Sequence, residues 1–325
     1  MLQNEKWLKP YAAFCYLRDK YKTSNAAEWK AHSVYNETEI EKLFKPGSAT
    51  NKIVNFHCWM QFHLHQQLRD VVEYAHANGV IIKGGIAMGV YRYGVDAWIA
   101  PELYKMELQA GAPPDDFAAK GQNWGFPTYN WKKMQEDGFA WWKQRFEQMS
   151  RYFDTFRIDH ILGFFRIWSI PVDAVQGIMG RFDPCLPVHK NEFGENGIWF
   201  DYNRFCTPYI TDAVLYEVFN EDAERIKKQF LQKNGPDTYS FLPEFDTQRK
   251  IAAWFLKKEN IADGEKIKNK LFDLISNVIL FEHEGSGDQF HFRIAMNNTI
   301  SYRYLPDHIK ERLWNLYIDY FFKRQ

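Results

Sequence analysis

Apolar residues recur at helical spacing between residues 59 and 77, and a short apolar run follows them. In this segment the apolar positions lie three or four residues apart, as on one face of a helix. Gly79 comes directly after it as a stop signal. The run 80–83 (VIIK) has the composition of a short strand that is buried on both faces. The pattern therefore predicts a helix over 59–77 and a strand over 80–83.

The same order of elements returns later in the chain. Trp142, Phe146, Met149 and Phe153 follow the spacing of a helix stripe, and the segment 156–161 (FRIDHI) has the apolar pattern of the next strand. Helix–strand units in succession are typical of an α/β protein with a parallel sheet and right-handed crossovers.

A long connection, residues 91–131, separates these two helix–strand units. Loops of this length are usually functional. In an α/β barrel, a connection that leaves the carboxyl end of a strand lies on the active-site face. The connection carries Trp, Tyr, carboxylate and amide side chains, which can stack on sugar rings and bind their hydroxyl groups. Some of its aromatic side chains, such as Phe126 and Trp131, are expected only to pack onto the sheet.

The two ends of the chain have other patterns. Residues 1–51 predict a short helical segment and a linker. After residue 171 the chain is loop-rich, then mostly helical and charged over 213–283, and an amphipathic helix begins at about Asp307. We therefore divide the chain into an N-terminal helical segment (1–51), an α/β segment with the long loop (52–171) and a helical accessory region (172–325).

Composition excludes several classes of protein. The 41 Lys and Arg residues balance the 41 Asp and Glu residues, so charge favours neither nucleic acid nor an acidic membrane as a partner. No apolar run has the length of a membrane span. The four cysteines lie far apart without a C-x-x-C motif, which favours a reduced, cytoplasmic setting. The spacing of His57, His63 and His65 does not place ligands on one helix face, so no metal site is expected.

Aromatic residues make up 18% of the chain, an unusually large share. Aromatic rings pack in cores, but they also stack on the C–H faces of sugars and on nucleic-acid bases. The zero net charge makes bases the weaker candidate.

The strand predicted at 156–161 has polar residues within an apolar stretch. Side chains alternate along a strand, so Arg157 and Asp159 share one face and His160 lies on the other. A guanidinium beside a carboxylate favours its ionised form, and an ionised carboxylate can attack a sugar's anomeric carbon or stabilise positive charge there. The alternative is a buried Arg–Asp pair that only holds strands together.

Three motifs occur in order along this part of the chain: GAPPDDF (111–117), GQNWGFPTY (121–129) and RIDHILGF (157–164). Together they resemble the 4-α-glucanotransferases of glycoside hydrolase family 77, the amylomaltases or disproportionating enzymes. The resemblance is strong over about 55–171, and the remainder is similar to the longer, insertion-bearing branch of the family. It implies an α/β fold, namely a partial (β/α)8 barrel of the TIM type with a largely helical inserted region.

The resemblance also implies roles for the residues at the predicted strand end. Asp159 matches the family's nucleophile, which forms a covalent glucosyl-enzyme intermediate with retention of configuration. Arg157 matches the arginine that orients this carboxylate. His160, in the same motif, is expected to contact substrate.

Three residues of the long connection match the family's substrate-facing loop: Asp115, Gln122 and Trp124. The implied reaction moves an α-1,4-glucan segment from one chain to the 4-OH of another glucan or of glucose. The implied partners are maltodextrin, glycogen or starch-type glucans, and no metal or organic cofactor is implied.

The sequence also departs from the family pattern. It has no E-D-L-G motif, which would carry the acid/base Glu, although retaining chemistry needs two carboxyl groups about 5–5.5 Å apart. Two evident barrel strands cannot close an eight-stranded barrel. Gly85 and Ala87 stand where the family has the Asp and Pro of K-G-D-x-P.

These departures lead to an expectation about the chain by itself. We expect an internal fragment of the enzyme, or one part of a split enzyme, with little or no activity alone. A non-catalytic α-glucan-binding protein and an incompletely folded remnant are the two alternatives.

Overall fold

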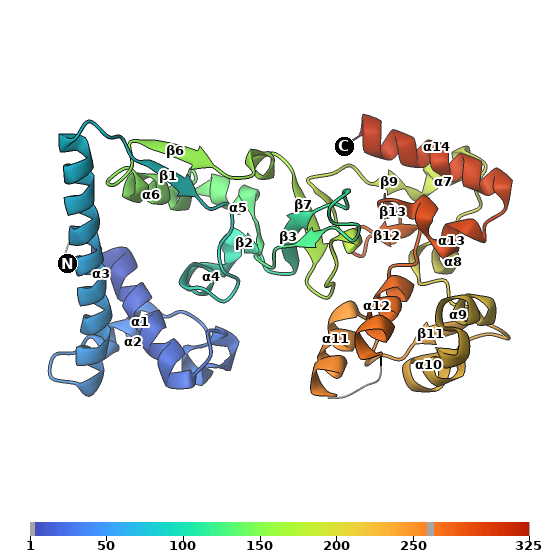
Figure 1. The fold of residues 1–325 in the computed structure, drawn as a ribbon, viewed down its shortest axis with the longest axis horizontal. Helices are drawn as coiled ribbons and strands as arrows, with labels where there is room; N and C mark the ends of the chain where they lie inside the picture. Colours follow the sequence, from blue (N-terminus) through green and yellow to red (C-terminus); the bar gives the residue numbers. More distant parts are fainter. Residues whose placement is uncertain (1–3, 259–262, 325) are drawn as a thin grey trace. The chain divides into compact units, whose positions relative to one another are not determined.

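The computed structural model describes residues 4–258 and 263–324, which form two compact units (Figure 1). Unit 1 holds the described residues up to Glu107 together with Gly125–Gly163. Unit 2 holds Leu108–Trp124 and the described residues from Phe164 onward. These boundaries differ from the three segments expected from the sequence, and that division stays a prediction.

Unit 1 is mostly helical and contains short strands. Its helices are α1 (Glu5–Tyr21), α2 (Glu37–Leu43), α3 (Ala49–Ala77), α4 (Val95–Ile99), α5 (Trp131–Glu136) and α6 (Ala140–Met149). Its strands are β1 (Lys83–Ile86), β2 (Tyr104–Lys105), β5 (Thr128–Tyr129) and β6 (Thr155–Ile158).

The predicted helix over 59–77 is confirmed as part of α3, which begins earlier, at Ala49. Ser48 starts this helix, because its side-chain oxygen accepts a hydrogen bond of 3.1 Å from the backbone N–H of Asn51. The helix ends at Ala77, and Gly79 follows in the left-handed conformation with φ of +70°. The stop predicted there is therefore confirmed.

The strand predicted at 80–83 is misplaced, because β1 begins only at Lys83. Asp154 sets this register: its carboxylate accepts a hydrogen bond of 2.9 Å from the N–H of Ile82, and its own N–H donates to the Ile82 carbonyl at 2.9 Å. Val80 and Ile81 are exposed, and β1 alternates between exposed and buried residues. Burial of this strand on both faces was therefore a wrong expectation.

The strand predicted at 156–161 is confirmed only in part, because β6 covers Thr155–Ile158, but its parallel pairing with β1 is confirmed. β1 and β6 lie side by side in parallel, with Gly85 opposite Arg157 (Figure 1). The preceding helix, α6, packs against β6 through the rings of Phe146 and Phe156, whose centres are 5.8 Å apart. Gly84 makes room for the ring of Phe153, since a Cβ at residue 84 would lie 2.4 Å from that ring.

The long connection is not the structureless loop that was expected. It contains α4, β2 and β5 in unit 1, and its middle part, residues 108–124, belongs to unit 2. In unit 1, Trp131 stacks on Trp142 and lies 5.0 Å from Tyr129, ring centre to ring centre. Trp131 thus packs on aromatic side chains of its own unit, and its packing onto the parallel sheet stays a prediction.

The first part of unit 2 is a four-stranded antiparallel sheet with the order β4–β3–β7–β8. Its strands are β3 (Leu108–Ala112), β4 (Gln122–Asn123), β7 (Ile167–Pro171) and β8 (Arg181–Asp183). Trp168 and Ile170 of β7 are buried in its core, where the indole N–H of Trp168 donates a hydrogen bond of 2.7 Å to the carbonyl of Gly177.

The rest of unit 2 is largely helical, as predicted, and has two hydrophobic cores. Its helices are α7 (Lys190–Glu195), α8 (Tyr202–Cys206), α9 (Asp212–Phe219), α10 (Ala223–Phe230), α11 (Gln248–Lys257), α12 (Gly264–Ile275), α13 (Ile300–Arg303) and α14 (Asp307–Lys323). Its strands are β9 (Val188–His189), β10 (Leu231–Lys233), β11 (Tyr239–Phe241), β12 (Leu280–Glu282) and β13 (Gln289–Phe292). The last predicted helix is confirmed as α14.

None of the described helices has the length and apolar character needed to cross a membrane.

Candidate active site

The carboxylate of Asp159 lies directly after β6, the second strand of the parallel pair. The side chains of Arg157 and Asp159 contact each other, with the Arg157 Nε 3.1 Å from the Asp159 Oδ1. Their side chains are 72% and 58% exposed, respectively, so the alternative of a buried pair that only holds strands together is not supported. The reason is local: in the described chain β1 is the sole strand paired with β6, and β6 remains largely exposed.

The turn after Asp159 is tight. His160 has a left-handed backbone with φ of +48°, a conformation that is uncommon outside glycine and often found at functional sites. The Gly163 N–H donates a hydrogen bond of 2.8 Å to the His160 carbonyl. A Cβ at residue 163 would lie 2.0 Å from the terminal methyl group of Met88, so a side chain here would displace the end of the Met88 side chain. The glycine of the RIDHILGF motif therefore has a packing role.

The segment after β1 is fixed by its backbone carbonyls. The carbonyl of Met88 accepts a hydrogen bond from the hydroxyl of Tyr129, and the carbonyl of Ala87 accepts one of 2.6 Å from Arg145. Burial raises the pKa of Tyr129 to about 12, so this hydroxyl stays protonated and can donate at neutral pH. The segment after β1 is thus held by contacts within unit 1.

Gly85 lies opposite Arg157 in the sheet and has open space around it. A Cβ at this position would meet no atom within 4 Å. The backbone therefore leaves room for the carboxylate that the resemblance places there, and the glycine is not required by packing.

The three loop residues lie in unit 2, at the hairpin between β3 and β4. Asp115 Oδ1 accepts hydrogen bonds from the N–H groups of Phe117 (2.9 Å) and Ala118 (2.6 Å), so this carboxylate stabilises the turn. The indole N–H of Trp124 donates a hydrogen bond of 3.0 Å to the Gln122 side-chain oxygen. Asp115 and Gln122 are exposed and Trp124 is half-buried.

The structure thus brings the predicted residues together in two groups. Arg157 contacts Asp159, with His160 next in the chain, in unit 1. Gln122 contacts Trp124, with Asp115 at the tip of the same hairpin, in unit 2.

Sequence reasoning missed Asp154, which joins the start of β6 to the end of α3. Its carboxylate accepts from the Ile82 N–H and lies 2.9 Å from the Nε2 of His76. The backbone hydrogen bond, followed by the His76 contact, lowers the pKa of Asp154. The one feature of the sequence that could have indicated this role is the position of Asp154 just before an apolar strand.

Two glycines shape the hairpin that carries Gln122 and Trp124. Gly121 has φ of +67°, and a Cβ there would lie 2.6 Å from the Ala112 carbonyl oxygen. A Cβ on Gly111 would lie even closer to the Gln122 carbonyl oxygen. The glycines of the GAPPDDF and GQNWGFPTY motifs therefore permit close backbone approach.

Gly121→Ala is expected to destabilise the protein by about 1–2 kcal/mol, because both its backbone conformation and the space around it disfavour a side chain. Urea unfolding measures the loss. Gly194→Ala is the matched control, since a Cβ on Gly194 would have no neighbour within 4 Å. An equal effect of the two substitutions would contradict this account of the hairpin.

Within residues 4–258 and 263–324, no cluster of three or more His, Cys, Asp or Glu side chains has the geometry to hold a metal ion. The four cysteines are free thiols.

A parallel strand pair in which each strand follows a helix is typical of α/β proteins. Comparison with known proteins identifies the family. The family model described as 4-alpha-glucanotransferase matches residues 1–269, most of the chain, so this chain belongs to the 4-alpha-glucanotransferases.

Two relatives illustrate the match in sequence. The chain is 40% identical over 333 residues to the rice (Oryza sativa subsp. japonica) 4-alpha-glucanotransferase DPE2, an alignment that covers 99% of this chain and 34% of the rice protein. It is 28% identical over 299 residues to the Aquifex aeolicus 4-alpha-glucanotransferase, covering 85% of this chain and 59% of that protein. The chain therefore spans about a third of the rice protein and 59% of the Aquifex protein, less than two thirds of either.

A solved structure shows the same kind of fold. The amylomaltase from Streptococcus agalactiae in complex with acarbose aligns with 98% of this chain and 73% of its own chain. The TM-score is 0.52 at 21% sequence identity, so this likeness concerns the fold alone. The mixed α/β fold expected from the sequence is thus confirmed.

Proposed function

We propose that this chain carries the nucleophile-bearing part of a 4-alpha-glucanotransferase, which transfers α-1,4-glucan segments between maltodextrins. The main support is the contact between Arg157 and Asp159 at the end of a parallel strand. In this proposal β1 and β6 are two strands of a (β/α)8 barrel, and residues 172–325 are a largely helical insertion. The glucans would be maltodextrin, glycogen or starch-type chains.

The proposed reaction is a retaining double displacement. The Asp159 carboxylate attacks the anomeric carbon of the donor glucan, the glycosidic bond breaks, and the departing oxygen takes a proton from an acid. The 4-OH of the acceptor then attacks the anomeric carbon of the glucosyl ester, gives its proton to the conjugate base of that acid, and releases the Asp159 carboxylate. Arg157 would orient the carboxylate through the contact of 3.1 Å between its Nε and the Asp159 Oδ1.

The other matched residues would hold the sugars. Trp124 offers an aromatic face for stacking, while Gln122, Asp115 and His160 offer hydrogen-bonding groups for sugar hydroxyls. Asp115 would act partly through the turn that it stabilises. The free thiols suit a reducing compartment, which supports the proposal of a cytoplasmic protein.

By itself this chain is expected to show no turnover, because its sequence has no E-D-L-G motif to supply the acid/base Glu. The test is incubation of the purified chain with maltotriose, followed by chromatography for glucose and longer maltodextrins. Disproportionation by the chain alone would refute the expected inactivity. The alternative is a non-catalytic α-glucan-binding protein. It would be favoured if the chain binds glucan but shows no turnover, even after segments of a relative are added.

Gly85→Asp is expected to strengthen maltoheptaose binding by roughly tenfold, because a carboxylate there could accept sugar hydroxyl hydrogen bonds at a site with free space. Isothermal titration calorimetry measures the change. Gly194→Asp adds the same charge in unit 2, also without a steric conflict, and should leave the affinity unchanged. If Gly85→Asp binds maltoheptaose more weakly than the wild type, residue 85 does not belong to the sugar site.

A further inference from the structure

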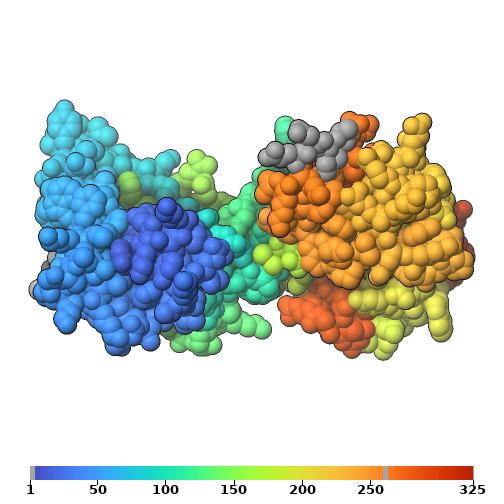
Figure 2. Space-filling model, turned by 90° about the horizontal axis from the view of Figure 1, so that it is seen from below, coloured from blue at the N-terminus to red at the C-terminus, as the bar shows by residue number. Residues whose placement is uncertain are grey.

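A cavity of about 480 Å³, here called the loop cavity, lies in unit 1 between the segment after α1 and the loop after β1. Residues 24–35 contribute one wall, and residues 92–106 contribute the other. In Figure 2 the dark-blue part of the chain, which includes the first wall, lies at the surface of unit 1. The volume is within the range of sites that bind small ligands.

Hydrogen bonds tie the two walls to each other. The indole N–H of Trp98, in α4, donates to the His32 carbonyl at 3.1 Å. The Oγ of Ser24 lies 3.3 Å from the hydroxyl of Tyr91. The buried rings of Trp29 and Trp98 also pack edge to face, with their centres 5.4 Å apart. Contacts within one unit therefore shape the loop cavity, as is usual for ligand sites, which are largely preformed.

The lining of the loop cavity offers the kinds of group that bind sugars. Tyr93 is 43% exposed, and an aromatic face of this kind can stack on the C–H face of a sugar ring. Ser33 and Tyr35 are half-buried and Glu102 is exposed, so their hydroxyl and carboxylate groups can bond to sugar hydroxyls. Burial raises the pKa of Tyr35, which keeps its hydroxyl protonated and able to donate.

The charges of this lining do not favour an anion. Among the described lining residues the charged ones are Arg92 and Glu102. Arg92 is buried, and its guanidinium donates to the backbone carbonyls of Gly125, at 3.3 Å, and of Met106. The protein backbone therefore engages this positive charge, whereas the carboxylate of Glu102 is exposed. A neutral ligand with many hydroxyl groups suits the loop cavity better than a phosphate or a carboxylate.

The second wall follows the same end of the strand pair as Asp159. β1 and β6 are parallel, so their carboxyl ends lie at the same edge of the pair. Residues 92–106 follow the carboxyl end of β1, and Asp159 follows that of β6. Loops at the carboxyl ends of parallel strands form the active-site face of an α/β barrel. A ligand in the loop cavity would therefore be held on the active-site face of the proposed barrel.

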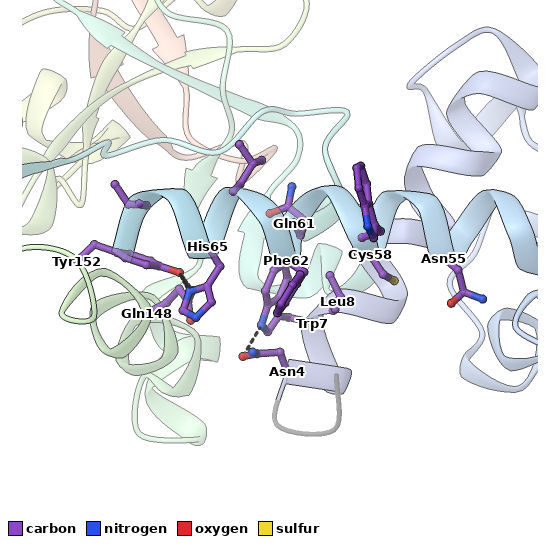
Figure 3. Close-up of a pocket in the computed structure, with 13 residues that line it drawn as sticks. Asn4, Trp7, Leu8, Asn55, Cys58, Gln61, Phe62, His65, Gln148 and Tyr152 are labelled. Atoms are coloured by element: carbon purple, nitrogen blue, oxygen red, sulfur yellow. Dashed lines mark hydrogen bonds between the residues drawn. The ribbon is translucent and has the colours of Figure 1, made fainter. Parts of the chain in front are cut away.

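Another cavity in unit 1, of about 520 Å³, lies along α3 and is here called the α3 cavity (Figure 3). The amide of Gln61 donates to the hydroxyl of Tyr11 at 3.1 Å. The amide of Gln148 donates to the hydroxyl of Tyr152 at 3.3 Å, and the Nδ1 of His65 lies 2.7 Å from the same hydroxyl. None of its described lining residues is Asp, Glu, Lys or Arg. Because several of its polar groups are already bonded, the α3 cavity is the weaker sugar site and provides the control.

We propose that the loop cavity is a glucan-binding site in addition to the residues matched by the family motifs. Tyr93 would stack on a glucosyl ring. Ser33, Tyr35 and Glu102 would bond to the hydroxyl groups of that ring. The ligand class, an α-1,4-glucan, rests on the proposed function. The site would hold long glucan chains on the active-site face.

Hydrogen exchange of the wild-type chain, with and without millimolar maltoheptaose, locates the ligand. We expect slower exchange in residues 24–35 and 92–106, and unchanged exchange along the α3 cavity. This measurement tests the site even if a variant folds poorly. The proposal is overturned if neither wall is protected, or if α3 is protected instead.

Tyr93→Ala should weaken maltoheptaose binding by at least about tenfold in isothermal titration calorimetry, because it removes the stacking ring. Tyr93→Phe keeps the ring and should restore binding to within about twofold of the wild type. Phe62→Ala is the matched control, since it removes a ring that is 53% exposed from the α3 cavity of the same unit, and it should leave the affinity unchanged. An equal loss in Tyr93→Ala and Phe62→Ala would overturn the proposal, and so would cellohexaose binding as tight as that of maltoheptaose.

The site and the proposed function fail in different ways. The decisive assay combines the chain with the segments of rice DPE2 that lie outside the aligned region. Protection of the loop cavity by maltoheptaose without disproportionation of maltotriose in this assay would refute the proposed function and support the site. Disproportionation without such protection would do the opposite.

Discussion

Asp159→Asn is expected to reduce glucan transfer by at least about 10⁴-fold when this chain is assayed together with the segments of rice DPE2 that lie outside the aligned region. The neutral amide has the same size but cannot form the glucosyl ester that the proposed mechanism requires. Stability should change by less than about 1 kcal/mol, because the ion pair with Arg157 is solvent-exposed. The measurements are maltotriose disproportionation and thermal unfolding of the same preparations.

Asp307→Asn is the matched control, since this carboxylate is 98% exposed at the start of α14. It should leave transfer unchanged. Arg157→Lys retains a positive charge but loses the fixed guanidinium geometry, so it should lower the rate less than Asp159→Asn. If Asp159→Asn transfers glucan at a rate within tenfold of the wild-type rate, the Asp159 carboxylate is not the nucleophile.

Local sequence patterns predicted the helices and strands of unit 1 better than they predicted which residues cover those elements. Helical spacing and the Gly79 stop located most of α3, and the repeated helix–strand order led to the parallel pairing of β1 and β6. The strand at 80–83 was misplaced because composition alone does not set register. The register depends on the hydrogen bonds between Ile82 and Asp154, which are far apart in sequence.

The sheet of unit 2 could not be predicted from local patterns. β3 pairs with β7, and the two strands are separated by a long stretch of sequence that returns to unit 1. Such non-local pairings leave no periodic signal. The exposure of side chains could not be predicted either. The apolar pattern around Arg157 indicates a strand, but it does not indicate which elements cover that strand.

The motifs indicated the members of the candidate site and the contact between Arg157 and Asp159. They did not indicate that Asp115 stabilises its own turn, or that Gln122 and Trp124 bond to each other. A motif gives residue types in order, whereas these contacts depend on the conformation of the hairpin.

The second large effect concerns stability and comes from His291, a fully buried histidine in unit 2. Its ring lies 2.7 Å from the Nδ1 of His283, 2.9 Å from the hydroxyl of Tyr320 and 3.5 Å from the sulfur of Cys185. Burial, followed by the charges of Arg181 and His283, lowers the pKa of His291 to about 3 from its ordinary value of 6.5. The folded protein therefore keeps this ring neutral at any moderately acidic pH.

The direction of the pH effect follows from proton uptake. Below pH 6.5 the unfolded chain binds a proton at His291 and the folded chain does not, so acid favours unfolding. The loss is about 2 kcal/mol between pH 7 and pH 5, and there is none above pH 7. Carboxylates with lowered pKa values, such as Glu192 and Asp319, add to the loss mainly below their ordinary values of 4.5 and 3.8.

Urea unfolding at pH 7 and pH 5, followed by a probe in unit 2, measures this loss. His291→Gln keeps a hydrogen-bonding side chain but cannot titrate, so its stability should change little over this range even if it is lower throughout. His57→Gln is the matched control in unit 1, where burial also lowers the pKa of His57. It should leave the acid sensitivity of unit 2 in place. An equal loss between pH 7 and pH 5 in His291→Gln and the wild type would show that other groups carry the acid sensitivity, because no proton can then be taken up at residue 291.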